Sequence, residues 1–447
     1  MKEYDSYKDS GIEYLNKIPA HWQELRMRFI GYLYGGLSGK SANDFNQLTN
    51  EDNKCFIPFT NIANNFRIDP ESLQTVVIAE NEKQNKVKKG DLFFLMSSEN
   101  YDDVGKSAVL LDDLEETYLN SFCKGFRITK ENIVPKFLNY QLHSKQLRHN
   151  LLTGANGFTR INLKIDKVID LLTALPPIAE QTSIASFLDR KTSEIDDIIA
   201  DKKRLLELYE EEKTAIINQA VTKGLDPNAP MKDSGIEWFG EIPEHWEVKK
   251  LKYIISAKLM YGANESADEE NKDNPRYIRI TDIGNDGNLN DETFKSLPPE
   301  KAKEYLLTEG DILFARSGAT VGKTYHFKNY KGEACFAGYL IKASPIKNVV
   351  ISDFFYLYTK SGAYENWKGS IFNQATIQNI GADKYAYLEV PVPAINEQKS
   401  IVHHIESECS KIDFKKARTE ELIELLTEYR TALISEAVTG KIKVTED

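Results

Sequence analysis

With 447 residues, the chain is too long for one hydrophobic core, and its length favours two to four domains. A hydrophobic share of 41% is ordinary for a globular protein, and because no apolar run reaches about 18 residues, we expect neither a membrane span nor a signal peptide. The four cysteines form no CxxC pair, which favours reduced thiols in a cytoplasm over a zinc site. The net charge of −11 argues against a DNA-binding protein, but acidic runs such as Glu210–Glu212 account for much of it.

An internal repeat organises the chain. Residues 9–14, DSGIEY, recur as DSGIEW at 233–238, and IPAHW at 18–22 recurs in the same register as IPEHW at 242–246. Farther along, LPPIAEQ at 175–181 recurs as VPAINEQ at 392–398 in a slightly different register. This second register, which we name the helix register, holds without insertion through the Ala-Val-Thr triplets that begin at 220 and 437. The chain is therefore one module written twice.

In chain order, each copy has a variable and a repeated part. Short runs rich in Val, Ile, Phe and Tyr, separated by Gly, Asn and Asp, predict strands and turns in the variable parts, for example GDLFF at 90–94 and GDILF at 310–314. We predict a repeated segment at 1–20, a mixed α/β domain at 20–175, a helix at 176–224, the segment again at 225–245, a second domain at 246–392 and a second helix at 393–447.

Heptad spacing predicts that the two helices pack against each other. One helix places an apolar or long side chain every seventh residue, with a second seam beside it: Leu188, Ile195, Lys202, Tyr209 and Ile216, flanked by Ile184, Ile198 and Leu205. The other repeats the register: Ile405, Ile412, Thr419, Leu426 and Leu433, flanked by Leu422 and Tyr429. Prolines at 176–177, 391 and 393 mark the starts, Gly224 and Gly440 mark the ends, and about 43 residues give a rod of roughly 65 Å.

Two similar but unequal modules suit a ligand with two similar but unequal halves, and duplex DNA is such a ligand. The repeated motifs KDSGIEWFGEIPEHW at 232–246, with its copy at 8–22, and PPIAEQ at 176–181, with its partner at 393–398, resemble the specificity subunit of type I restriction-modification systems. The resemblance covers essentially the whole chain in the family's order of domains. Its first copy departs only mildly, with Tyr14 in place of Trp238.

The resemblance implies an α+β fold: two mixed α/β target recognition domains separated by two long helices that pack as an antiparallel coiled coil, with an internal pseudo-two-fold repeat. It implies a bipartite, asymmetric duplex DNA target. It also implies partners, namely two methyltransferase subunits that use S-adenosylmethionine to methylate adenine N6, and ATP-driven restriction and translocase subunits that use Mg²⁺. We expect no cofactor on this chain itself.

Polar residues in Gly-rich stretches of the variable domains are the candidate base readers. Arg pairs with guanine, and Asn or Gln with adenine. The candidates are Ser97, Ser98, Asn156, Arg160, Arg316, Ser317, Asn373 and Gln374, and the preferred pair of loops is Gly154–Arg160 and Gly369–Gln374, because both precede a helix.

The stretch SGATVGKT at 317–324 resembles a phosphate-binding loop but has Ser317 where the motif requires glycine. Two interpretations stay open for it and for DVGKS at 103–107. Either Lys323 and Lys106 approach a DNA phosphate beside turn amides, or both segments are plain hairpins.

Motifs for catalysis are missing from the sequence. It contains no NPPY-type tetrapeptide, no GxG cofactor loop, no Pro-Asp dipeptide and no HExxH helix, so we expect no catalytic or metal site. Glu180-Gln181 and Glu397-Gln398 are candidate contacts for repeated partner subunits, or else first-turn residues favoured by the helix dipole. Three other functions remain open: a specificity subunit whose partner fuses methyltransferase and endonuclease, a two-module protein scaffold that does not bind DNA, and a stand-alone enzyme.

Overall fold

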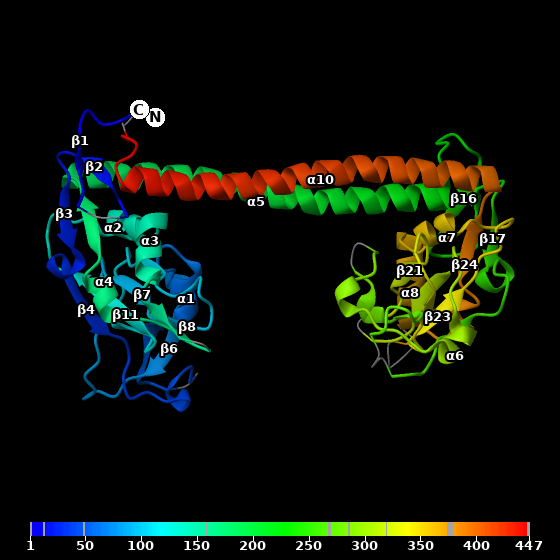
Figure 1. Cartoon of the computed structure of the whole chain (residues 1–447), viewed down its shortest axis with the longest axis horizontal. Coiled ribbons are helices and arrows are strands. Elements are labelled where there is room, and N and C mark those ends of the chain that lie inside the picture. The colour runs from blue at the N-terminus through cyan, green and yellow to red at the C-terminus, as the bar shows by residue number, and fades with distance from the viewer. Residues whose placement is uncertain are drawn as a thin grey trace. The chain divides into compact units, whose positions relative to one another are not determined.

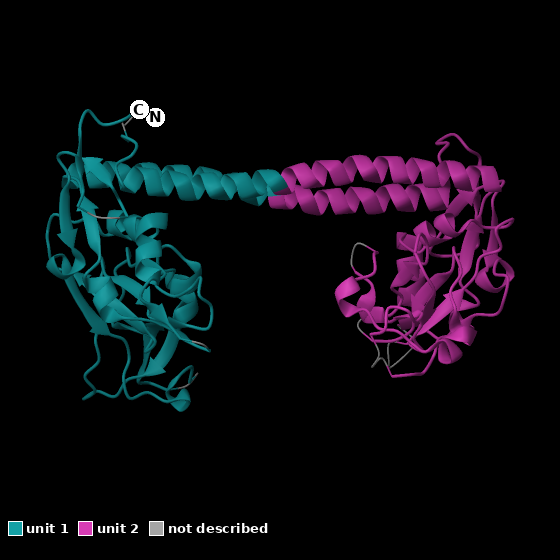
Figure 2. Ribbon diagram, viewed as in Figure 1, with its two compact units in different colours: residues 1–202, 421–447 teal, residues 203–420 magenta. Residues whose placement is uncertain are grey.

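The computed structural model describes residues 2–11, 14–47, 50–157, 159–266, 270–284, 287–318, 320–372 and 379–444. The chain divides into two compact units: unit 1 holds residues 1–202 and 421–447, and unit 2 holds residues 203–420 (Figure 2). Both divisions fall inside long helices, α5 (Ile178–Lys223) and α10 (Ile395–Val438), so each unit contains a module and a part of both helices (Figure 1). The two mixed α/β domains and the two long helices of the predicted α+β fold are confirmed.

Unit 1 is built on a four-stranded antiparallel sheet in the order β4 (Gly31–Gly35), β11 (Cys123–Ile128), β7 (Leu92–Leu95), β9 (Ser107–Val109). All four side chains of β7 are buried, because the sheet is covered on both faces. A second sheet, in the order β10 (Thr117–Leu119), β5 (Asn53–Ile57), β6 (Gln74–Val77), joins β10 to β5 in parallel.

Smaller pairings complete this module. Strand β3 (Gln23–Arg26) pairs with β14 (Leu172–Leu175), and β8 (Ser97–Ser98) continues from β7 into a sheet with β13 (Ile161–Leu163) and β12 (Ala155–Asn156). The hairpin of β1 (Tyr7–Asp9) and β2 (Lys17–Pro19) precedes them. The helices are α1 (Phe59–Asn64), α2 (Pro135–Leu142), α3 (Lys145–Leu152) and α4 (Ile165–Ile169), with 3₁₀ turns η1 (Met27–Phe29), η2 (Ala42–Asp44) and η3 (Pro70–Ser72).

Unit 2 repeats this plan. Its four-stranded sheet runs β18 (Met260–Tyr261), β23 (Leu340–Ala343), β20 (Ile312–Ala315), β21 (Thr324–His326). Strand β19 (Arg276–Ile278) pairs in parallel with β22 (Ala334–Phe336), β17 (Glu247–Lys250) pairs with β24 (Glu389–Val392), and β15 (Met231–Asp233) pairs with β16 (Glu241–Pro243). The remaining elements are α6 (Pro299–Ala302), α7 (Ser352–Tyr358), α8 (Gly362–Phe372), α9 (Ala382–Tyr385), η4 (Leu251–Tyr253), η5 (Ile280–Asp282), η6 (Asp291–Thr293) and η7 (Lys303–Tyr305).

A carboxylate in the first turn of each long helix fastens the helix to the repeated His-Trp pair. In unit 1, Trp22 Nε1 donates to Glu180 Oε1 at 3.1 Å, and His21 Nε2 lies 2.8 Å from Glu180 Oε2. In unit 2, Trp246 Nε1 donates to Glu397 Oε1 at 2.9 Å, and His245 Nε2 lies 2.9 Å from Oε2. Both indoles are fully buried, so each Trp is a packing residue, whereas each His is exposed and binds the same carboxylate from the surface.

The next residue ties the same turn to its module. Gln181 Nε2 donates to the carbonyls of Asn132 and Pro176, and its Oε1 accepts from Val134 N at 2.8 Å. Gln398 makes the matching three bonds to Val349 O, Pro393 O and Ile351 N. At the other ends, Gly224 and Gly440 adopt φ +74°, the left-handed conformation that terminates helices, so the predicted starts and ends are confirmed.

The two helices pack antiparallel within each unit. In unit 2, Lys213 Nζ lies 2.7 Å from Asp413 Oδ1 and Lys416 pairs with Glu210, so residue numbers rise along one helix as they fall along the other. In unit 1, Arg430 Nη2 donates to Asp196 Oδ2 at 3.1 Å. Leu188, Ile195, Ile405, Ile412 and Leu433 are buried as predicted.

The second predicted seam is only partly confirmed: Ile184 is buried and Leu205 is half-buried, but its other three members are exposed. Ile198, Leu422 and Tyr429 are exposed, and the inner positions belong to the residues that follow them: Ile199, Ile423 and Arg430. The side chains that complete the contact between the helices lie four residues after each position of the first seam. They include Thr192, Cys409 and Lys416. A search for apolar residues alone misses these positions, because Lys and Arg can cover the seam with their methylene groups while their charged ends reach carboxylates at its edge.

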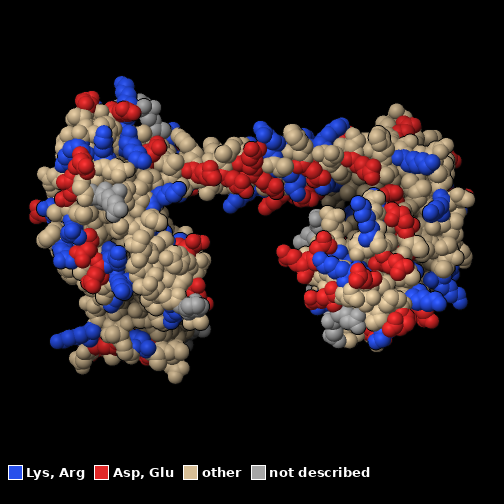
Figure 3. Space-filling model, viewed as in Figure 1, with Lys and Arg blue, Asp and Glu red and all other residues tan. Residues whose placement is uncertain are grey.

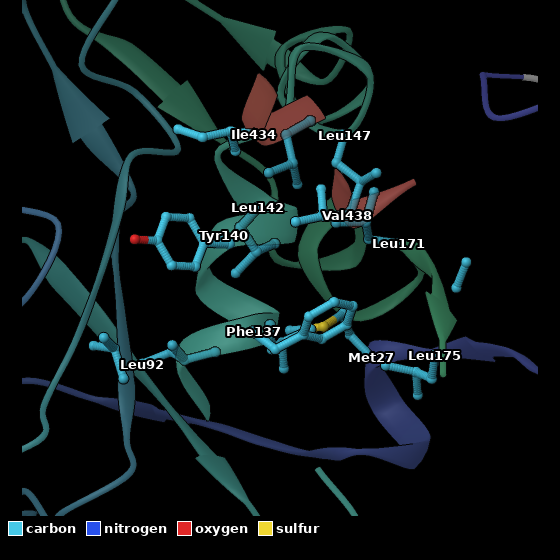
Figure 4. Packing of buried hydrophobic residues seen from close by; sticks show 14 of the residues in the cluster. Met27, Leu92, Phe137, Tyr140, Leu142, Leu147, Leu171, Leu175, Ile434 and Val438 are labelled. Atoms are coloured by element: carbon cyan, nitrogen blue, oxygen red, sulfur yellow. The ribbon is translucent and has the colours of Figure 1, made fainter. Parts of the chain in front are cut away.

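The end of α10 enters the core of unit 1. Figure 4 shows Ile434 and Val438 beside Leu142 and Leu147 from α2 and α3, with Met27 and Phe137 beneath them. Gln141 Nε2 donates to Val438 O at 3.0 Å, and Lys145 N donates to Ser435 Oγ at 3.0 Å. This end of the helix is therefore an internal element of the module.

A basic side chain occupies the same half-buried position at the end of α2 and of α7. His143 Nε2 lies 2.7 Å from Ser107 O in unit 1, and Lys360, its equivalent in the helix register, donates to Thr324 O at 3.3 Å in unit 2. Burial lowers the pKa of His143 to about 4 and that of Lys360 to about 8. His143 is thus neutral in the folded protein where an unfolded chain would protonate it.

We expect unit 1 to lose stability as the pH falls from 6.5 toward 4. The unfolded chain binds a proton at His143 in this window and the folded chain does not, so protonation favours unfolding, by up to about 3 kcal/mol at the acid end. The measurement is urea unfolding of wild type and His143→Gln from pH 4 to 8. The difference between the free energies of unfolding of wild type and variant should change with pH. If both proteins lose the same stability as the pH falls, His143 has no such role.

Candidate nucleic-acid interface

Three short strands bring polar side chains into a row on unit 1. Asn162 on β13 lies directly opposite Ser97 of β8 on one side and Asn156 of β12 on the other. Directly opposed residues of an antiparallel pair project from the same face, so the three side chains share one surface. The next pair along, Ser98 and Ile161, faces the module, and Ser98 is only 7% exposed. The edge therefore has an apolar inner face and a polar outer face.

An arginine and an aromatic ring border this row. The guanidinium carbon of Arg160 lies 4.7 Å from the ring centroid of Phe122, and both side chains are exposed. Stacking on the ring orients the planar guanidinium while its N–H groups stay available. We call Ser97, Phe122, Asn156, Arg160 and Asn162 the polar edge of unit 1.

Unit 2 contains the corresponding edge with different side chains. Ser317 forms an antiparallel bridge with Asn379, and Ile380 N donates to Arg316 O at 2.8 Å, just as Leu163 N donates to Met96 O in unit 1. The Arg316 guanidinium carbon lies 5.0 Å from the ring centroid of Tyr261, and Tyr339 is exposed where unit 1 has Phe122. Arg316, Ser317, Tyr261, Tyr339 and Asn379 form the polar edge of unit 2.

The structure brings together five of the predicted readers, namely Ser97 with Asn156 and Arg160 in unit 1 and Arg316 with Ser317 in unit 2, but it separates others. Ser98 points inward and accepts from Asn100 N. The Gly154–Arg160 segment includes strand β12, so it is not wholly a loop. Residues 369–372 of the second preferred loop belong to α8, while Asn373 and Gln374 lie outside the described residues.

The two lysines of the phosphate-loop-like segments are occupied within the chain. Lys106 Nζ lies 2.6 Å from Asp103 Oδ1 and donates to Ala63 O, and Lys323 Nζ donates to Ile283 O at 2.9 Å. Both segments connect neighbouring antiparallel strands, β7 to β9 and β20 to β21. These contacts favour the hairpin interpretation over contact with a phosphate.

The candidate partner contacts divide into two kinds. Gln181 and Gln398 are buried, and their amides are satisfied by backbone, so their role is to anchor the helices. Glu180 and Glu397 are partly exposed but hold the Trp-His pairs. Among the described residues, no group of three His, Cys, Asp or Glu side chains is placed to hold a metal ion. None of the described helices combines the length and apolarity that crossing a bilayer requires.

The sequence analysis missed Asn162, Asn379, Phe122, Tyr339 and Tyr261. A signal for four of them was present, because Asn162 with Asn379 and Phe122 with Tyr339 are equivalent positions in the helix register. A polar or aromatic residue that keeps its type in this register inside otherwise diverged segments marks the same place in both modules.

Comparisons with known proteins agree with this duplicated plan. A family model described as type I restriction modification DNA specificity domain matches the chain twice, at residues 37–208 and 243–424. The chain belongs to this family. Each match spans one module and the first part of the helix that follows it.

Two type I specificity subunits resemble the chain, one along nearly its whole length and the other along less than half of it. The MjaVIII specificity subunit of Methanocaldococcus jannaschii is 24% identical over 452 residues, covering 98% of this chain and 97% of the relative. The EcoKI specificity subunit of Escherichia coli strain K12 is 27% identical over 209 residues, covering 45% of this chain and 44% of the relative.

Two solved structures share the fold of this chain. A chain from a study of assembly and conformational transition in a type I R-M system has a TM-score of 0.73 and 16% identity, covering 95% of this chain and 99% of that chain. The HsdS subunit from Thermoanaerobacter tengcongensis has a TM-score of 0.56 and 16% identity, covering 95% and 98%.

We expect Asn162→Ala and Asn379→Ala each to weaken binding of the specific duplex by about 1–3 kcal/mol and to relax the choice at one base pair, because an Asn side chain reads adenine through two hydrogen bonds. Fluorescence anisotropy with the target and with single-base variants measures both effects. Asn228→Ala is the matched control, because Asn228 is an exposed asparagine in the turn after α5, outside both polar edges. Unchanged affinity and base preference in both edge variants would show that these asparagines do not read DNA.

Proposed function

We propose that this chain is the DNA-reading subunit of a type I restriction-modification complex and that it grips a bipartite, asymmetric duplex site, one half with each polar edge. The observation that supports this most directly is the pair of edges, Ser97 with Asn162 and Ser317 with Asn379, which occupy one position in two diverged copies of a module. Shared scaffolding and different side chains are what two unequal half-sites require.

The chemistry of the edges suits base recognition in a groove. Asn and Ser offer donors and acceptors of the length that base edges require, and Arg160 and Arg316 present guanidinium groups held by aromatic rings. The neighbouring exposed rings, Phe122 and Tyr339, add apolar contact for a thymine methyl or sugar. We assign the half-sites to residues 20–175 and 246–392.

In this proposal the chain places the complex on its DNA site, and the partner subunits carry out the reactions. The partners are two methyltransferase subunits that use S-adenosylmethionine, and restriction and translocase subunits that use ATP and Mg²⁺, acting in the cytoplasm. The helices α5 and α10, with 46 and 44 residues, set the gap between the half-sites; at 1.5 Å per residue each is roughly 65–70 Å long.

An exposed apolar stripe on the helices is the proposed docking surface for the methyltransferase subunits. In unit 1, Leu422, Leu425 and Tyr429 lie on one face of α10 at spacings of three and four residues, and Leu425 is 54% exposed. In unit 2, Leu208 is the equivalent of Leu425 in the helix register and is also exposed, and Phe414 is a further exposed apolar residue on α10. These side chains lie outside the contact between the two helices, so they are available for a helix of a partner.

Exchanging residues 246–392 for those of a relative should change one half of the methylated DNA motif and leave the other half intact, because each unit has its own core and its own edge. Sequencing of modified bases in cells that carry the chain and its partners checks this. A change in both halves, or in neither, would contradict the assignment of one unit to one half-site.

Leu425→Glu should weaken assembly with the methyltransferase subunits by about tenfold or more, since it places a charge in an apolar contact, and should leave the helices folded because the residue is exposed. Co-elution in size-exclusion chromatography measures assembly, and Glu424→Ala on the same helical turn is the control. Normal assembly of Leu425→Glu would exclude this face as the docking surface.

A further inference from the structure

A second repeated surface lies outside the polar edges. Arg26-Met27-Arg28-Phe29 in unit 1 recurs as Lys250-Leu251-Lys252-Tyr253 in unit 2, in the register that relates the two His-Trp pairs. Met27 and Leu251 are buried, and each is held by a backbone bond: Met27 N donates to Leu171 O at 3.0 Å and Leu251 N to Leu388 O at 2.8 Å. Because Met27 and Leu251 point into the core, the residues on either side of them face solvent. Phe29 and Tyr253 are 63% and 64% exposed.

One substitution removes an acidic neighbour from the basic pair in the second copy. In unit 1, Asp170 follows α4 and pairs with Arg28, and its carboxylate also lies 3.9 Å from Arg26 Nη1. In unit 2 the equivalent position in the helix register is Tyr387. The acidic partner of the first copy is thus replaced by an aromatic ring in the second.

The lysines of unit 2 stack on tyrosines, and Lys250 also has Glu389 directly opposite it across the β17–β24 pair, so Lys252 is the lysine of the two without a facing carboxylate in that pair. Lys252 Nζ lies 4.2 Å from the ring centroid of Tyr387 and 5.0 Å from that of Tyr253, and Lys250 Nζ lies 5.1 Å from Tyr387. A ring face attracts an ammonium group but does not neutralise it, so its N–H groups can still bind an anion. The neighbouring Lys249 is paired with Glu247 at 2.8 Å and adds no free charge.

The position of this surface suits a duplex that already lies on the polar edge of unit 2. Asn379 on that edge and Tyr387 are joined by Gly381 and the single-turn helix α9, and Ala382 N donates to the hydroxyl of Tyr261 on the same edge at 2.9 Å. Figure 3 shows basic side chains at the border of unit 2 on the side where Figure 1 places β17, with acidic side chains close by.

We propose that Lys250 and Lys252, backed by Tyr253 and Tyr387, bind phosphates of the DNA that flanks the half-site of unit 2, and that Asp170 disables the equivalent contact in unit 1. This inference rests on the proposed DNA-reading function and adds an asymmetry to it: one unit holds the backbone beyond its half-site and the other does not. Such contacts are independent of sequence and fix the protein's register on the duplex.

The test is the salt dependence of duplex binding by the full chain in complex with its methyltransferase partners, measured by fluorescence anisotropy on a target with long flanks. Each phosphate contact contributes about 1 to the slope of log K against log salt concentration. Lys250→Gln with Lys252→Gln should make the slope shallower by about 2 and weaken binding equally for every sequence. Trimming the flank beside the half-site of unit 2 should abolish the difference between variant and wild type.

The matched variants exploit the repeat. Arg26→Gln with Arg28→Gln should leave the slope unchanged, Tyr387→Asp should reproduce the loss seen with the lysine variant, and Asp170→Asn should steepen the slope by releasing two arginines. All of the substituted side chains are at least partly exposed, so the fold should tolerate each change.

Two results would overturn the inference while leaving the proposed function in place. The lysine variant could keep the wild-type slope and affinity for the target, or it could bind DNA normally and instead lose assembly with the methyltransferase subunits, which would make the surface a protein-docking site. Failure of the proposed function itself looks different, because the wild-type complex would then show no preference for any target over random duplex.

Discussion

In each half of this protein, a glutamate carboxylate that accepts a hydrogen bond from a buried indole joins the long helix to its module. Glu180 and Glu397 lie in the first turn of a long helix, where the helix dipole favours a negative charge, and each uses one oxygen for a tryptophan N–H and the other for a histidine. The glutamine that follows adds three bonds to its module's backbone. These contacts fix where the helix begins and how it is rotated relative to its module. The side chains of the polar edge, which belong to the same module, therefore have a defined orientation relative to the helix axis.

Around this joint the two modules keep their backbone and change their surface. The half-buried base at the end of α2 and α7 is histidine in one copy and lysine in the other, yet both bond the equivalent strand. At the polar edges the bridge between Ser and Asn is retained, while the arginine is the residue just before β13 in unit 1 and the residue just after β20 in unit 2. The polar edges therefore keep their strand pairing while side chains on them change, which permits new ligand preferences without refolding.

Much of the architecture was predictable from the sequence, and the reason is the repeat. Helix ends followed from Pro176, Pro177 and the two glycines, since these residues act locally. Part of the second helical seam was predicted wrongly, because the place of a side chain in a seam depends on which neighbours cover it: Arg430 and Lys416 are half-buried, whereas Leu422 is exposed.

The residues of the polar edges were only partly predictable, because Asn162 becomes a neighbour of Ser97 through strand pairing between segments far apart in the chain. The partner role of Gln181 looked open in the sequence for the same reason, since its hydrogen bonds to Asn132 and Val134 are tertiary contacts.

The ion pairs between the helices carry a record of ancestry. Asp196 with Arg430 and Asp413 with Lys213 are a single pair written twice, because in the helix register Asp413 is the equivalent of Asp196 and Arg430 is the equivalent of Lys213. Such reciprocity, in which residue i meets j and j meets i, is the signature of an isologous contact between identical subunits. A single-module ancestor with one such helix would have met its own twin through these same two pairs. Joining two such modules in one chain would keep this interface and let the surface of each half change independently of the other.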